Sequence, residues 1–104
     1  MRLVVKIGGA AVDDKTMLLQ CARAVASLVS EGHEVAVVHG GGAALTRMMH
    51  QLGKESEFIN GLRVTDSATR DMALMVLAGG VNKALVAALS SIGQSAVGMC
   101  GGDG

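Results

Sequence analysis

Residues 34–42 have the sequence EVAVVHGGG, a short apolar run that ends in three glycines. A similar run, LVVKIGG, occupies residues 3–9. β-Branched residues favour strands, and glycine pairs or triplets end strands in turns. Both runs are apolar at consecutive positions, as in a parallel sheet that is covered by helices on both faces. We therefore expect parallel strands over 3–7 and 34–38, with their glycine turns at one edge of the sheet.

Helical spacing of apolar residues fills the segments between these runs. Asp13 and Asp14 are suited to cap the first helix, Gly32 and Gly53 are placed to stop helices, and Gly79-Gly80 is expected to interrupt one. A polar loop or hairpin is expected over 54–64, and a third strand over 94–100. The expected helices cover residues 15–31, 43–52, 66–78 and 81–91. This alternation predicts an α/β three-layer sandwich with a mainly parallel sheet.

Composition excludes several classes of function. The 104 residues suffice for one small domain. Nine basic residues balance nine acidic ones, and Phe58 is the only aromatic residue, so nucleic-acid binding has little support. No residues have metal-ligand spacing, and the distant Cys21 and Cys100 are expected to be reduced thiols. The longest apolar stretch, 72–81, is about half a membrane span, and the first apolar run is too short for a signal peptide. We expect a cytoplasmic protein without membrane contact.

The glycine turns predict an anion site. Ligands of open α/β sheets bind outside the carboxyl ends of the strands. Without Cβ atoms, successive N–H groups can converge on an anion, and a helix that begins directly behind them adds its dipole. The alternative is that Gly8-Gly9 and Gly40-Gly41-Gly42 only make tight turns.

Two known phosphate-binding patterns do not fit the chain. A Walker loop, G-x-x-x-x-G-K-[ST], does not occur, and the dinucleotide pattern fails at Leu45, where a small residue is required. An acidic residue about twenty positions after Gly8-Gly9 is also missing. A dinucleotide-binding domain therefore remains only as an alternative.

Two basic residues are candidates for this site. Lys6 lies in a run that is expected to be buried, two positions before the first glycine turn, where its ammonium would stabilise charge on a transferring phosphoryl group. The alternative is an edge strand with Lys6 in solvent. Arg63 offers a planar fork that suits a carboxylate, although its position alone favours an exposed loop arginine.

Taken together, these motifs resemble the amino-acid kinase family over essentially the whole chain. The resemblance rests on VKIGG at 5–9, VHGGG at 38–42, NGLRVT at 60–65, Ala78-Gly79, Asn82-Lys83 and GDG at 102–104. The HGGG and NGLRVT motifs at this separation are typical of the branch that acts on N-acetyl-L-glutamate. The branch that acts on aminoadipate in lysine biosynthesis competes with it.

The resemblance implies transfer of the γ-phosphoryl group of ATP, bound with Mg²⁺, to the side-chain carboxylate of N-acetyl-L-glutamate in arginine biosynthesis. It also implies a homodimer formed through the helix at 66–78. By matching position, it implies these roles: Lys6 as catalytic residue, Gly8, Gly9 and Gly40 near the phosphates, Gly41 and Gly42 holding the acyl acceptor, and Arg63 clamping the substrate α-carboxylate.

Family members are more than twice as long as this chain, and their second half supplies the adenine pocket and a second catalytic lysine. The resemblance therefore implies that residues 1–104 are the amino-acid-binding and dimerisation portion, which is expected to be inactive without an ATP-binding portion. A strand that begins at residue 2 or 3 implies the arginine-insensitive type. A non-catalytic interaction module made from half a kinase is the remaining alternative.

Overall fold

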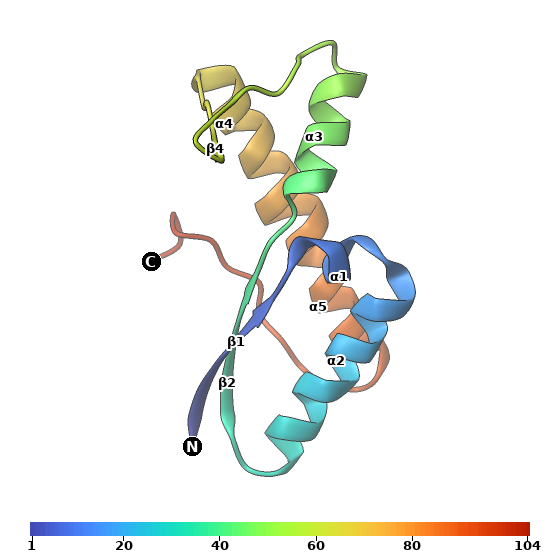
Figure 1. Ribbon diagram of the computed structural model, residues 1–104. Coiled ribbons are helices and arrows are strands. Elements are labelled where there is room, and N and C mark those ends of the chain that lie inside the picture. The colour runs from blue at the N-terminus through green and yellow to red at the C-terminus, as the bar shows by residue number, and fades with distance from the viewer.

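Two parallel strands, β1 (Arg2–Ile7) and β2 (Glu34–His39), form the sheet of the computed structural model, which describes residues 1–104 (Figure 1). The register pairs Arg2 with Glu34 at one end and Ile7 with His39 at the other. Both strands therefore finish side by side, and the glycine turns follow at the same edge. This arrangement confirms the predicted α/β class and the parallel pairing.

The first glycine turn continues into a short helix that the sequence did not predict. In α1 (Gly9–Asp13), the carbonyl of Gly8 accepts hydrogen bonds from the N–H groups of Ala11 and Val12. The longer helix α2 (Lys15–Ser30) begins as predicted, because the Asp14 carboxylate accepts from the N–H of Met17 at 2.8 Å. Gly32, with φ 90°, follows its end.

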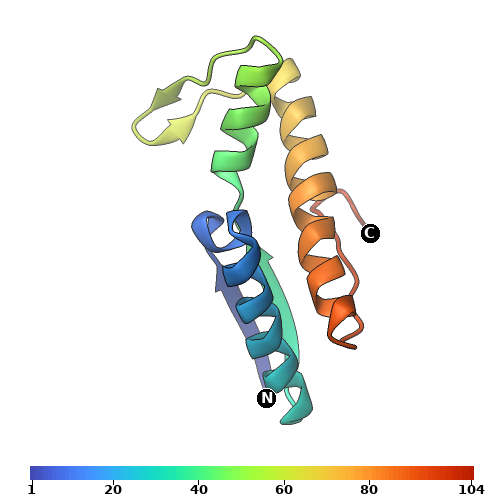
Figure 2. The same ribbon diagram turned by 90° about the vertical axis from the view of Figure 1, so that its right-hand side faces the viewer.

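The main core lies between one face of the sheet and two helices. Helix α2 lies along the strands (Figure 2), and α5 (Asn82–Ser91) packs beside it. The buried side chains of this core are Ile7, Val12, Leu18, Ala22, Val25, Leu85 and Leu89.

The opposite face of the sheet carries no helix. Val4 is 75% exposed and Val38 is 51% exposed on this face. The third layer of the predicted sandwich is therefore not formed by these residues, because the apolar stripes of α2 and α5 merge into one core on a single face.

A second, smaller core lies beyond the glycine edge. Helix α3 (Gly42–Gln51) contributes Leu45 and Met49, which pack against Val76. The hairpin of β3 (Phe58–Ile59) and β4 (Leu62–Arg63) follows, in the segment predicted as a loop or hairpin. Positive φ values of 51° at Asn60 and 77° at Gly61 form its two-residue turn.

One continuous helix connects the two cores, which corrects the interruption predicted at Gly79-Gly80. It runs through α4 (Ser67–Ala73), the π-helical segment η1 (Leu74–Val81) and α5. Glycine in a helix costs only about 1 kcal/mol relative to alanine, and the buried residues on either side of the pair hold the helix together. By length and apolar composition, Ser67–Ser91 is also long enough to cross a membrane, which residues 72–81 alone are not. Its buried apolar side chains, Val76, Leu85 and Leu89, belong to the two cores.

The third strand predicted over 94–100 does not form. Its residues alternate between half-buried and exposed, as in a strand, but they pair with neither β1 nor β2. The carbonyl of Gly98 instead accepts from the Lys83 Nζ of α5 at 3.2 Å. The segment therefore follows α5, and a cavity of about 620 Å³ lies between it and β2.

Gly80→Ala tests the continuity of the long helix. A Cβ atom at Gly80 meets no atom within 4 Å, and its φ is not positive. We expect the change to raise the free energy of unfolding by up to about 1 kcal/mol, measured by urea denaturation of the complete protein that includes this chain. Gly53→Ala is the control and should destabilise, because Gly53 has φ 76°. A loss of stability with Gly80→Ala would contradict a helix through this position.

Candidate functional site

The candidate site is the edge where the two glycine turns meet. The N–H of Gly40 donates to the carbonyl of Ile7 at 3.0 Å, which joins the end of one strand to the turn of the other. A Cβ atom at Gly40 would lie 2.9 Å from the backbone nitrogen of Gly9, and one at Gly9 would lie 3.3 Å from the nitrogen of Gly41. Backbone therefore packs directly on backbone, which only glycine permits.

This contact gathers backbone N–H groups that have no partner. The N–H of Gly41 donates to no acceptor in the chain, and Gly9 and Gly42 are the first residues of α1 and α3, where an N–H group has no partner within its own helix. Gly9 opens α1 and Gly42 opens α3, so two helix N-termini face the same edge (Figure 1). Unpaired donors of this kind favour a bound anion.

Gly41 is also fixed by the long helix. It is buried and has φ 150° and ψ 20°. A Cβ atom there would lie 2.7 Å from Cδ2 of Leu77 and 3.2 Å from Cγ2 of Val81. The π-helical segment η1 therefore covers the second glycine turn, and Gly41 has a role beyond turning the chain.

Lys6 lies at this edge but is exposed. Its register partner is Val38, so its side chain stands on the face of the sheet that no helix covers. The expectation that Lys6 is buried is therefore wrong, because that expectation assumed helices on both faces of the sheet. Lys6 lies two residues before Gly8, and its ammonium makes no hydrogen bond or ion pair within the chain.

Arg63 reaches the same edge from the hairpin. Its Nη2 donates to the carbonyl of Gly42 at 3.2 Å and to Oγ1 of Thr46 at 3.0 Å. Its Nη1 donates to Oγ of Ser56 at 2.7 Å, and its guanidinium lies 4.7 Å from the ring centre of Phe58. All of these partners are neutral, so no carboxylate in the chain compensates the charge of Arg63.

The loop that carries Arg63 is held at both ends. Nζ of Lys54 donates to Oδ2 of Asp66 at 2.8 Å, and Oδ1 of Asp66 accepts from the N–H of Thr69 at the start of α4. The Lys54 ammonium, helped by the Thr69 N–H, holds the pKa of Asp66 well below its usual range. Asp66 is thus a loop anchor and helix cap, ionised at neutral pH.

His39 makes two hydrogen bonds, one with the carbonyl oxygen of Gly40 and one with the side chain of Asn82. Asn82 is only 8% exposed on α5, and from the sequence it had no role in the site beyond its place in a motif of the family. Asn82 stands three and seven positions before the core residues Leu85 and Leu89. A polar residue at helical spacing from apolar core residues was the feature of the sequence that could have identified Asn82.

Comparisons with known proteins show what the chain is similar to. The profile of the Amino acid kinase family matches residues 1–104. The chain is 65% identical over 104 residues to an acetylglutamate kinase of Acidobacterium capsulatum, and 57% identical over 103 residues to one of Koribacter versatilis. It spans 40% of the length of each of these relatives, in their N-terminal portion.

A solved structure of N-acetylglutamate synthase from Neisseria gonorrhoeae, complexed with coenzyme A and N-acetyl-glutamate, superposes on the chain with a TM-score of 0.73. The identity is 29%, and the match covers 88% of this chain and 21% of that one.

Proposed function

The chain belongs to the amino acid kinase family, and we propose that it is the amino-acid-binding and dimerisation portion of an ATP-dependent kinase. The substrate that we propose is N-acetyl-L-glutamate. An oxygen of its side-chain carboxylate attacks the γ-phosphorus of ATP, the bond to the bridging oxygen breaks, and ADP leaves with that electron pair. The product is an acyl phosphate. Catalysis of this kind consists of alignment and charge stabilisation.

The observation that carries this proposal is the uncompensated charge of Arg63 beside the second glycine turn. A guanidinium surrounded by neutral acceptors attracts an anion, and its planar fork suits a carboxylate. We assign Arg63 to the α-carboxylate of the substrate. The names of the relatives, and the N-acetyl-glutamate in the solved structure of similar fold, support the choice of substrate.

The glycine edge then holds the reacting groups. We assign the N–H groups of Gly41 and Gly42 to the acyl-acceptor carboxylate, and Gly8, Gly9 and Gly40 to the approach of the phosphates. Lys6 has a free ammonium at the same edge, and we assign it to the charge that builds on the phosphoryl group during transfer.

ATP and Mg²⁺ are assigned mainly to a part of the protein outside this chain. No group of three or more His, Cys, Asp or Glu side chains in the chain is placed to hold a metal ion. We assign no step of the reaction to the ion.

We further propose that the protein is a homodimer formed through α4 and η1. Leu74 is 59% exposed and Met75 is 61% exposed on this helix, so burial against a second copy would remove apolar surface from water. Sedimentation of the complete protein tests this assignment. Leu74→Glu with Met75→Glu should give monomers, whereas Met17→Glu on α2 should not. An unchanged dimer in the double variant would place the interface elsewhere.

Arg63→Ala tests the carboxylate clamp. The change removes a charge-assisted contact worth about 1.5–3 kcal/mol, so we expect the KM for N-acetylglutamate to rise roughly 10- to 100-fold in the complete protein. The KM for ATP should stay unchanged in steady-state assays. The control is Arg23→Ala, an exposed arginine of α2. A rise in the KM for ATP alone would contradict the assignment.

Lys6→Ala tests the role of the free ammonium. Lys6 is exposed and has no partner in the chain, so its loss should leave the fold intact. We expect kcat to fall roughly 10²-fold or more, because the lost charge acts mainly in the transition state. The matched control is Lys15→Ala, another exposed lysine. Unchanged turnover in Lys6→Ala would refute this role.

A further inference from the structure

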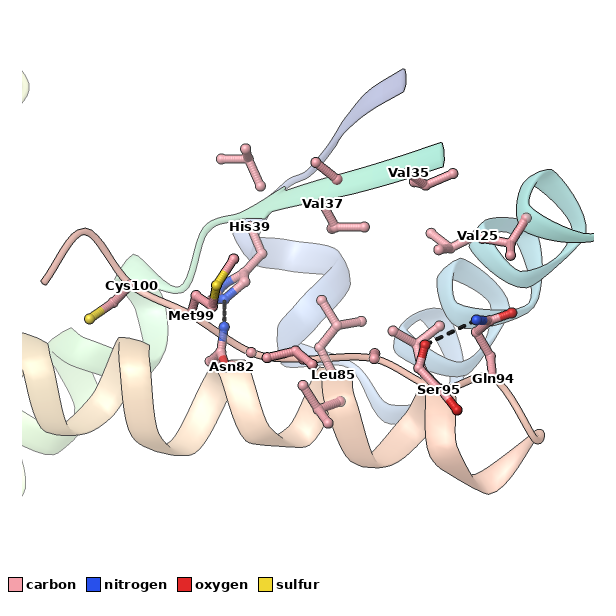
Figure 3. Close-up of a pocket in the computed structure, with 18 of the residues that line it drawn as sticks. Val25, Val35, Val37, His39, Asn82, Leu85, Gln94, Ser95, Met99 and Cys100 are labelled. Carbon is pink, nitrogen blue, oxygen red and sulfur yellow. Dashed lines mark hydrogen bonds between the residues drawn. The ribbon is translucent and has the colours of Figure 1, made fainter. Parts of the chain in front are cut away.

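Two side chains outside the assigned site hold the second glycine turn in place. His39 is the last residue of β2, and Asn82 is the first residue of α5, forty-three positions later. Figure 3 shows the imidazole of His39 directed toward the Asn82 amide, with a hydrogen bond between them. Nε2 of His39 lies 3.1 Å from Nδ2 of Asn82, and Nδ1 lies 2.8 Å from the carbonyl oxygen of Gly40.

These partners determine which ring nitrogen of His39 carries the proton. A carbonyl oxygen only accepts, so Nδ1–H must donate to Gly40. The amide Nδ2 only donates, so Nε2 must accept with its lone pair. The neutral ring with its proton on Nδ1 satisfies both contacts, and the tautomer with its proton on Nε2 satisfies neither.

Asn82 cannot reverse this assignment by turning its amide. Its Oδ1 accepts from Nζ of Lys83 at 3.2 Å, so an amide turned by 180° would direct its NH₂ group at an ammonium. Asn82 is also buried, so an unpaired amide there would be costly. Lys83 therefore orients Asn82, and Asn82 orients His39.

The carbonyl that His39 holds belongs to the peptide group that carries the N–H of Gly41. A peptide group is planar, and in the trans form its C=O and N–H point in opposite directions. Fixing the Gly40 oxygen on the imidazole therefore directs the Gly41 N–H away from it. Between two glycines this peptide has unusual freedom to rotate, so an anchor is required to keep one orientation.

We propose that His39 and Asn82 are a positioning pair that directs the N–H of Gly41 at the acyl-acceptor carboxylate. The inference rests on the proposed function, in which that N–H holds the reacting group. Neither side chain contacts substrate in this account. They act through the Gly40–Gly41 peptide, and Leu77 and Val81 lie against Gly41.

The first test does not depend on catalysis. Long-range ¹H–¹⁵N spectra of the complete wild-type protein at neutral pH report which nitrogen of His39 bears the proton. We expect the Nδ1–H form. The Nε2–H form would overturn the positioning pair, whatever reaction the protein catalyses.

The second test compares two replacements of His39. Asn places its amide nitrogen near the position of Nδ1, and Gln places its amide nitrogen near that of Nε2. His39→Asn therefore keeps a donor for Gly40, whereas His39→Gln keeps only a group that faces Asn82. We expect His39→Gln to lower kcat roughly 10-fold or more, with the KM for ATP unchanged, and His39→Asn to keep most of kcat.

A larger loss of kcat in His39→Asn than in His39→Gln, or an equal loss in both variants, would overturn the positioning pair and leave His39 with a packing role only. If His39→Gln does not fold, as judged by thermal unfolding, Asn82→Ala replaces it. That variant should lower kcat and weaken the preference for Nδ1–H, and unchanged values of both would contradict the proposal. If the wild-type protein does not turn over N-acetylglutamate, the proposed function is refuted instead. The spectra would still test the positioning pair, because they do not depend on catalysis.

Discussion

Close contact between two stretches of backbone, Gly8-Gly9 and Gly40-Gly41, is the constraint on which the rest of the structure depends. No side chain fits between Gly9 and Gly40, so the two strands must finish at the same level and their helices must start from the same edge. The same contact leaves N–H groups from both turns without partners. A fold requirement and a candidate anion site thus arise from the same residues.

The charges around this edge have a consistent pattern. Asp13 is paired with Arg47 and Asp66 with Lys54, so these acidic groups have structural partners. Lys6 and Arg63 have no acidic partner, and both lie at the glycine edge. An unpaired cation is tolerated at a surface but favours a bound anion. Under the proposed function, this site is one side of an active centre, in a chain that spans two fifths of the length of its relatives from Acidobacterium capsulatum and Koribacter versatilis.

Periodicity predicted β1, β2, α2, α3 and the polar hairpin, because each has a clear apolar face or a specific turn signal such as Asn60-Gly61. The errors share a physical cause. Gly79-Gly80 was expected to interrupt a helix, although packing of the residues on both sides of this pair keeps the helix continuous. Residues 94–100 alternate like a strand, but strand formation also needs a partner, and local pattern does not supply one. For the site, the motifs indicated the glycines and Arg63. The exposure of Lys6 and the pairing of Asn82 with His39 depend on tertiary contacts that spacing does not reveal.

The central claim is that the glycine edge and Arg63 together bind an acidic N-acylated amino acid. The most direct measurement is the change in ¹H–¹⁵N signals of the complete protein on addition of N-acetyl-L-glutamate. We predict that the backbone amides of Gly41 and Gly42 and the guanidinium of Arg63 shift in a saturable manner and with one common affinity. Saturable shifts that spare these groups and fall instead on residues lining the cavity between β2 and residues 94–100 would contradict the account.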